Sequence, residues 1–154
     1  SYISLAFYFL INFKMKQNFI NYLTFIVFFA IIVDVSAYFT GKSFGGRKLA
    51  VNLSPNKTVS GSVGGVIIPV IICLVFFGKS HNYLEIVIFS IILSLIAQAG
   101  DLIESSFKRF CYVKDTSNII PGHGGILDRI DSIILLIIFI SIMKLFGYNF
   151  FFIV

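Results

Sequence analysis

Acidic side chains stand where the apolar segments of this sequence begin or end, which makes them candidates for chemistry at a membrane surface. Asp34 lies near the end of one segment, Asp101 and Glu104 lie at the end of another, and Asp128 and Asp131 directly precede a third. Each pair is spaced by three residues, so its members share one face of a helix. Carboxylates in or beside a membrane span are costly unless they are paired, hydrated or bound to a metal ion. We therefore expect these carboxylates to line a polar cavity at one membrane depth.

A divalent cation is one ligand that such a cavity would suit. Hard cations prefer oxygen ligands, and Mg²⁺ typically takes one or two carboxylates together with substrate phosphates. The alternative is that the carboxylates form ordinary ion pairs at the interface with the nearby basic residues Lys108, Arg109 and Arg129. The spacing alone leaves both interpretations open.

A stretch rich in hydroxyls and glycines precedes another apolar segment. It reads SPNKT at residues 54–58 and SGSVGG at residues 60–65. Free N–H groups at a helix N-terminus bind phosphate, and hydroxyls and a lysine add direct contacts. The P-loop pattern GxxxxGK[ST] is absent from the sequence. The stretch is therefore either another kind of phosphate-binding loop or an ordinary glycine-rich turn that enters a membrane helix.

A second glycine-rich stretch, PGHGG at residues 121–125, would let the backbone approach a ligand closely. Its His123, taken alone, is more typical of a structural hydrogen bond than of catalysis. The sequence lacks the His and Cys spacing of a zinc site. Cys73 and Cys111 form no CxxC pair, and we interpret both as reduced and structural.

The composition indicates a membrane protein. Of the 154 residues, 58% are hydrophobic and 12% are charged, whereas a soluble domain carries about 25% charged residues. Four apolar stretches lack the alternation of barrel strands and are predicted to be helices, at residues 19–39, 62–77, 83–102 and 132–154. We expect an all-α, polytopic transmembrane helical bundle with cytoplasmic catalytic loops.

Residues 1–154 are expected to form a single membrane domain. The stretch 2–13 is apolar but shorter than the roughly 20 residues of a membrane helix, and it lacks the basic flank and cleavage site of a signal peptide. We interpret it as the remainder of a span that runs outward. On this interpretation the chain is an N-terminally truncated catalytic part.

Basic residues predict the orientation. The net charge is +5, and the two long links at residues 40–61 and 104–131 hold eight Lys and Arg residues, against three in the links on the other side. The positive-inside rule makes the long links cytoplasmic. The compact loops and the abundance of Ile, Phe, Asn and Lys are typical of a bacterial protein, so we expect the inner (plasma) membrane. Because the basic residues form no long run, nucleic acid is not an expected partner.

Several stretches together resemble the signature of the phosphatidate cytidylyltransferase family. They keep the family's order and spacing: SSFKR at 105–109, KDTS at 114–117 and IPGHGGILDRID at 120–131. Further stretches resemble upstream family segments: DVSAY at 34–38, GKSFG at 41–45, SPNKT at 54–58 and QAGD at 98–101. One departure is the pair Val59 and Ser60, where the family usually has Trp and Glu.

The resemblance implies a Mg²⁺-dependent reaction of CTP with phosphatidate that yields CDP-diacylglycerol and pyrophosphate in phospholipid biosynthesis. It implies three metal ligands, Asp101, Asp128 and Asp131. It assigns catalysis to Asp101, Asp128, Lys108 and Arg109, and substrate binding to Ser54, Lys57, Thr58, Lys114, His123 and Arg129. The implied partners are the two substrates and the lipid bilayer, and a homodimer is left open.

Two other functions stay open. A cytidylyltransferase for another phosphorylated lipid, such as an isoprenoid, would tolerate the same motifs. A non-enzymatic transporter fragment would use intramembrane carboxylates for ion passage. A transporter predicts carboxylates spread through the membrane depth, whereas here they gather at one side with basic loops.

Overall fold

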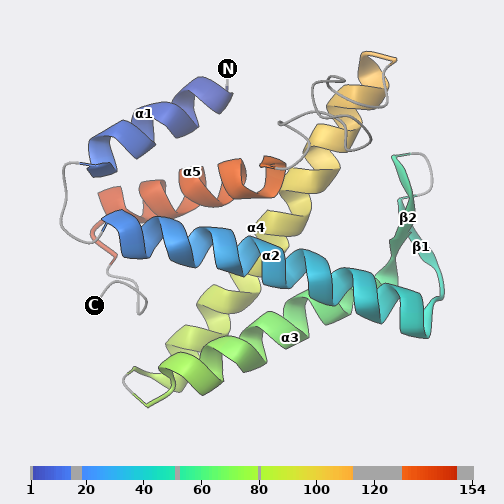
Figure 1. The fold of residues 1–154 in the computed structure, drawn as a ribbon, viewed down its shortest axis with the longest axis horizontal. Coiled ribbons are helices and arrows are strands. Elements are labelled where there is room, and N and C mark those ends of the chain that lie inside the picture. The colour runs from blue at the N-terminus through green and yellow to red at the C-terminus, as the bar shows by residue number, and fades with distance from the viewer. Residues whose placement is uncertain (1, 15–18, 51–52, 80, 113–129, 149–154) are drawn as a thin grey trace.

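Helices dominate the computed structural model, which describes residues 2–14, 19–50, 53–79, 81–112 and 130–148 (Figure 1). Within these residues the order of elements is α1 (Tyr2–Lys14), α2 (Phe19–Phe44), β1 (Lys48–Ala50), β2 (Ser54–Thr58), α3 (Val59–Phe77), α4 (Tyr83–Phe110) and α5 (Asp131–Leu145). Helix α2 packs along α3, α3 packs on α4, α4 crosses α5, and α1 lies against α5. The predicted all-α bundle is confirmed.

Three of the described helices, α2, α3 and α4, are long and apolar enough to cross a membrane. Most residues in their apolar windows are not buried within the chain, so lipid is the natural solvent for their outer faces. The chain is an integral membrane protein. Helices α2 and α4 contain 26 and 28 residues and would measure about 39 and 42 Å. Both therefore extend past a hydrocarbon layer of about 30 Å.

The fourth predicted span, at residues 132–154, differs from the structure. Helix α5 has 15 residues and ends at Leu145, which corresponds to about 22 Å. Gly147 follows with a φ of 84°, a left-handed conformation that commonly terminates helices. A single helix over residues 132–154 was predicted, and this is wrong for residues 146–148, which follow the end of α5. Residues 149–154 lie outside the described residues.

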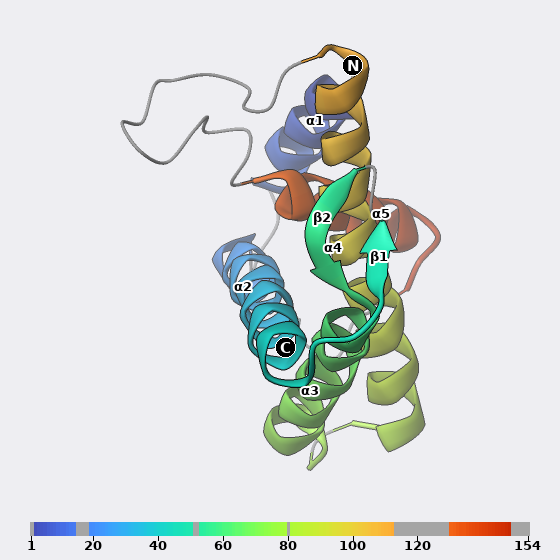
Figure 2. The ribbon, with the colours of Figure 1, turned by 90° about the vertical axis from the view of Figure 1, so that its right-hand side faces the viewer.

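The long link predicted at residues 40–61 is also more ordered than expected. Helix α2 continues to Phe44, and Gly45 and Gly46, with φ values of 59° and 102°, turn the chain out of it. Strands β1 and β2 then form an antiparallel hairpin in which Lys48 pairs with Thr58. Figure 2 shows this hairpin beside the end of α2 and the start of α3.

Glycines set the close approach of α2 and α3. Gly61 and Gly64 of α3 are buried. A Cβ at Gly64 would lie 2.5 Å from the Cβ of Thr40, and one at Gly61 would lie 2.7 Å from the carbonyl oxygen of Ala37. Any side chain at these positions would push the two helices apart. Small residues serve the same purpose in many membrane helix pairs, where van der Waals packing replaces the hydrophobic drive of water.

A buried tyrosine near the start of α2 joins this helix to α5. Tyr22 of α2 has its hydroxyl 3.2 Å from the Ser141 hydroxyl and donates to the Ile137 carbonyl at 3.4 Å. Both partners belong to α5, and the Tyr22 side chain is 2% exposed. This contact satisfies a polar group away from water and joins α2 to α5.

We predict that Gly64→Ala destabilises the fold, because the added methyl meets a β-branched side chain that has little freedom to move. The free energy of unfolding should fall by about 1–3 kcal/mol, as is usual for overpacking. Cys73 is buried, so a thiol-reactive dye can follow thermal unfolding in detergent in a Cys111→Ser background. Val63→Ala is the matched control, since Val63 is 52% exposed. Equal melting temperatures for the two variants would contradict the packing argument.

Candidate active site

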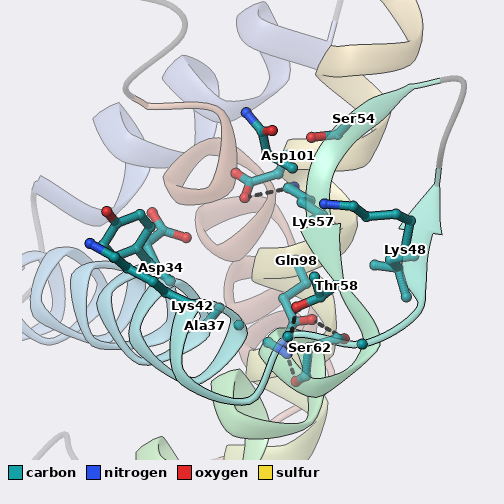
Figure 3. A pocket seen from close by; sticks show the side chains of 17 residues that line it. Asp34, Ala37, Lys42, Lys48, Ser54, Lys57, Thr58, Ser62, Gln98 and Asp101 are labelled. Carbon is teal, nitrogen blue, oxygen red and sulfur yellow. Dashed lines mark hydrogen bonds and ion pairs between the residues drawn. The ribbon is translucent and has the colours of Figure 1, made fainter.

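A cavity of about 640 Å³ lies where the end of α2, the hairpin, the start of α3 and the middle of α4 meet (Figure 3). Lysines and carboxylates line it together with glycines and hydroxyls. Asp101 stands 18 residues after the start of α4 at Tyr83, which is about 27 Å along the helix. The cavity therefore lies beyond the midpoint of α4, and two of the five acidic residues expected to cluster, Asp34 and Asp101, line it.

One face of α2 forms a wall of the cavity. Asp34, Ala37, Tyr38 and Gly41 line it, and their spacing of three, four and seven residues is that of one helix face. Asp34 was expected among the clustered carboxylates, but it was not among the predicted site residues. In the sequence these residues belong to the DVSAY and GKSFG stretches. Their helical spacing was the signal that could have identified them as site residues.

An ion pair joins the hairpin to α4 inside the cavity. The Lys57 ammonium of β2 lies 3.0 Å from an Asp101 carboxylate oxygen. The two side chains are 31% and 23% exposed, so the attraction is screened less than at an open surface. The structure thus brings together two predicted site residues that are 44 positions apart.

Asp131, at the start of α5, stands beside this pair. The Asp131 carboxylate accepts a hydrogen bond of 2.8 Å from the Ser132 N–H and interacts electrostatically with Asp101 and Asp34. Gly100 makes the approach of α5 possible, because a Cβ there would lie 3.0 Å from the Ser132 Cα. Three carboxylates, those of Asp34, Asp101 and Asp131, therefore interact with one another beside Lys57.

A polar seam beneath the cavity connects α3 to α4 and to the turn after α2. The Ser62 hydroxyl donates to the Gln98 side-chain oxygen, and the Gln98 amide donates to the Ser62 carbonyl at 3.2 Å. The Ser60 hydroxyl donates to the Gly45 carbonyl. Gln98 and Ser62 line the cavity but were not predicted as site residues. Gln98 lies three residues before Asp101, and this spacing was the available signal.

The predicted hairpin residues have different surroundings. Ser54 and Lys57 line the cavity. Thr58 also lines it but is 8% exposed, and its hydroxyl caps α3 by accepting from the Gly61 N–H at 3.1 Å. Thr58 therefore helps to shape the site through the backbone.

Lys108 and Arg109 do not line the cavity. Lys108 stands seven residues beyond Asp101 on α4, about 11 Å along the helix. Its ammonium lies 3.6 Å from a carboxylate oxygen of Glu104, which is 3% exposed. For Glu104 the structure thus shows the interfacial ion pair that the sequence had left as the alternative. Arg109 is exposed near the end of α4.

The remaining predicted site residues lie outside the described residues: Lys114, His123, Asp128 and Arg129. Their roles stay predictions. Within the described residues, no three or more Asp, Glu, His or Cys side chains are grouped so that they could hold a metal ion together. Cys73 and Cys111 are free thiols, one buried and one exposed, as expected.

Comparison with known proteins assigns the chain to a family. The model of the family described as "Cytidylyltransferase family" matches residues 1–146. The chain belongs to the cytidylyltransferase family. The match includes the α2 wall, the hairpin and the α4 carboxylate, so the cavity falls within the part of the chain that defines the family.

Curated relatives in this cytidylyltransferase family are bacterial proteins named phosphatidate cytidylyltransferase. The protein of Bacillus subtilis (strain 168) is 40% identical over 145 residues, which are 90% of this chain and 53% of that protein. That of Staphylococcus saprophyticus is 39% identical over 146 residues, covering 93% and 55%. That of Haemophilus influenzae is 44% identical over 115 residues, covering 70% and 40%. The chain spans about half the length of the first two relatives.

We predict that Gly100→Ala loosens the contact between α4 and α5 next to Asp101. The added methyl would meet α5 backbone, which cannot rotate away as a side chain could, and the free energy of unfolding should fall by about 1–3 kcal/mol. Hydrogen exchange measured by mass spectrometry should speed up in the first turn of α5. Leu95→Ala, on the 53% exposed side of α4, is the control. Unchanged exchange at the start of α5 would contradict this role of Gly100.

Proposed function

We propose that the protein transfers the cytidylyl group of CTP to phosphatidate, giving CDP-diacylglycerol and pyrophosphate. The observation that carries this proposal is the Lys57–Asp101 ion pair, set among further carboxylates in a cavity at one end of the spanning helices. Membership in the cytidylyltransferase family supports the reaction type. The names of the relatives support phosphatidate over an isoprenoid phosphate as the acceptor.

The reaction requires one bond to form and one to break. A phosphate oxygen of phosphatidate attacks the α-phosphorus of CTP, and the bond from that phosphorus to the oxygen bridging to the β-phosphate breaks. Pyrophosphate leaves with the electron pair. No covalent intermediate with the protein is needed, because the acceptor phosphate is itself the nucleophile. The task of the site is then to position two anions and to neutralise their charge.

The charges of the cavity fit a divalent cation. Three carboxylates, those of Asp34, Asp101 and Asp131, repel one another, and Lys57 attracts two of them, Asp34 and Asp101. Asp101 and Asp131, together with Asp128, would hold Mg²⁺ in this proposal, a donor set that suits a cation taking few carboxylates and several phosphate oxygens. When bound, Mg²⁺ supplies positive charge to the phosphates of CTP and so favours departure of pyrophosphate.

The chain's own residues bind and orient the substrates. Lys57 and Ser54 stand on the hairpin wall, from which an ammonium and a hydroxyl reach phosphate oxygens. Thr58 and the Ser62–Gln98 contact keep that wall in place against α3 and α4. We propose that further phosphate contacts come from Lys108 and Arg109 near the end of α4, and from three residues that follow α4 in the sequence, Lys114, His123 and Arg129.

We further propose that the cavity faces the cytoplasm from the inner membrane of a bacterium. The lysines at the cavity, Lys42, Lys48 and Lys57, lie at the same end of the bundle and follow the positive-inside rule. CTP is a cytoplasmic metabolite, and a lipid acceptor explains a site beside a membrane surface. A homodimer stays a prediction, which light scattering of the purified protein in detergent would test.

The deciding experiment is a turnover assay on the protein as its gene encodes it, purified in detergent. Labelled CTP is incubated with Mg²⁺ and either phosphatidate or a polyprenyl phosphate, and the lipid product is separated. Product from phosphatidate is expected. Product from the polyprenyl phosphate alone would move the function to another lipid. A folded protein that yields product from neither acceptor would overturn the proposal.

We predict that Asp101→Asn and Asp128→Asn each lower kcat by at least roughly a hundredfold, the scale of losing one charge-stabilising group in a transition state. Glu85→Gln, on an exposed acidic residue in the first turn of α4, is the matched control and should keep its turnover. The melting temperatures of all three variants show whether they fold. Turnover at the level of the unmodified protein in a folded Asp128→Asn variant would remove Asp128 from the metal site.

A further inference from the structure

One lysine of the cavity has no assigned role. Among the described residues, three lysines line the cavity, namely Lys42, Lys48 and Lys57. Lys57 pairs with Asp101 at 3.0 Å, and the Lys42 ammonium lies over the Tyr38 ring, 5.8 Å from its centroid. Within the residues that the structure describes, the Lys48 ammonium takes part in no hydrogen bond or ion pair.

The backbone of Lys48 is held in place even though its side chain is exposed. Lys48 pairs with Thr58 across the hairpin, and Thr58 in turn caps α3. The Val59 N–H donates to the Arg47 carbonyl at 2.9 Å, which closes the base of the hairpin on the first residue of α3. A lysine anchored in this way loses less freedom when it binds a ligand than one on a free loop.

The direction of the Lys48 side chain indicates which ligand it would meet. Figure 3 shows Lys48 extending from β1 toward Lys57, with Ser54 on the same hairpin. Two ammonium groups that share one wall of a cavity repel each other, and an anion between them would relieve that repulsion. The carboxylates of Asp34 and Asp101 come from helices α2 and α4. The hairpin thus contributes Lys48 and Lys57 to the cavity, whereas the helices contribute Asp34 and Asp101 together with Lys42.

We propose that Lys48 binds a phosphate group of a substrate, in a subsite that it forms with Lys57 and Ser54. The polarity of the cavity suits a phosphate that arrives with a divalent cation, since the oxygens meet the lysines while the cation meets the carboxylates. This inference rests on the proposed function for its substrates. The phosphate belongs either to the triphosphate of CTP or to phosphatidate, and the two share the chemistry that the subsite recognises.

An exposed lysine is ordinarily just solvated, so the proposed contact needs a control. Arg47 provides one. It is the preceding residue, carries the same charge and is exposed, but it does not line the cavity. Lys48→Met and Arg47→Met remove the same charge from neighbouring positions. A general electrostatic effect would appear in both variants, whereas a direct contact would appear only in the first. Lys48→Arg keeps the charge and tests whether a cation suffices.

The experiment compares these three variants with the unmodified protein, as the gene encodes it, in nanodiscs. Binding of inorganic tripolyphosphate and of CTP is measured by calorimetry, and KM is measured separately for CTP and for phosphatidate. Lys48→Met should weaken one phosphate ligand by roughly ten- to a hundredfold, the range of losing one charged hydrogen bond. Arg47→Met should change affinity by less than about threefold, and Lys48→Arg should recover most of the loss. The KM that rises identifies the phosphate.

The outcomes separate the two proposals. If the unmodified protein turns over CTP but Lys48→Met and Arg47→Met behave alike, the subsite is overturned and the proposed function stands. If turnover is absent while tripolyphosphate binds and only Lys48→Met loses it, the subsite stands and the proposed function fails. If the folded, unmodified protein binds neither tripolyphosphate nor CTP, the subsite is overturned as well.

Discussion

The close approach of α2 and α3 is the constraint on which the rest of the structure depends. Lipid offers little hydrophobic drive for one apolar helix to pack on another. Gly61 and Gly64 let the α2 and α3 backbones come near enough for van der Waals contact and for a short turn between α2 and the hairpin. Without that approach, Thr58 could not cap α3 at the place where it also meets Gly41. The shape of the cavity follows from this packing.

Charge within the cavity depends on the same packing. Lys57 reaches Asp101 because β2 ends at the start of α3, and α3 lies on α4. A carboxylate at this depth would be costly alone, and the ion pair offsets part of that cost. Asp131 adds negative charge from α5, which Gly100 admits to the site. Helices α2, α3, α4 and α5 and the hairpin thus all contribute residues to one polar centre.

A cavity of this polarity is suited to phosphate transfer, which asks a protein mainly to place anions and neutralise them. The hairpin carries the lysines and a hydroxyl, and the spanning helices carry the carboxylates. The proposed reaction joins a lipid to a nucleotide, and these two can meet only where membrane and water meet. Asp101 lies in the second half of α4, beside the C-terminal end of α2 and the start of α3.

The sequence by itself determined the membrane class, the helices and the identity of the polar residues. Long apolar runs have no stable alternative to helices in lipid, so α2, α3 and α4 were predictable. The helix-spaced carboxylates also pointed to one membrane depth. Local pattern could not show that α2 continues to Phe44 or that residues 48–58 form a hairpin, because those outcomes depend on the two glycines after α2 and on pairing with the start of α3.

Only the tertiary structure decided which polar residues share the site. It placed Asp34, Gln98 and Lys48 at the cavity with Lys57 and Asp101, and it paired Lys108 with Glu104 away from it. Sequence spacing determines which residues share a face of one helix, but it does not determine which faces of different helices meet. That choice is made by the glycine contacts between α2, α3, α4 and α5, which act between residues far apart in the chain.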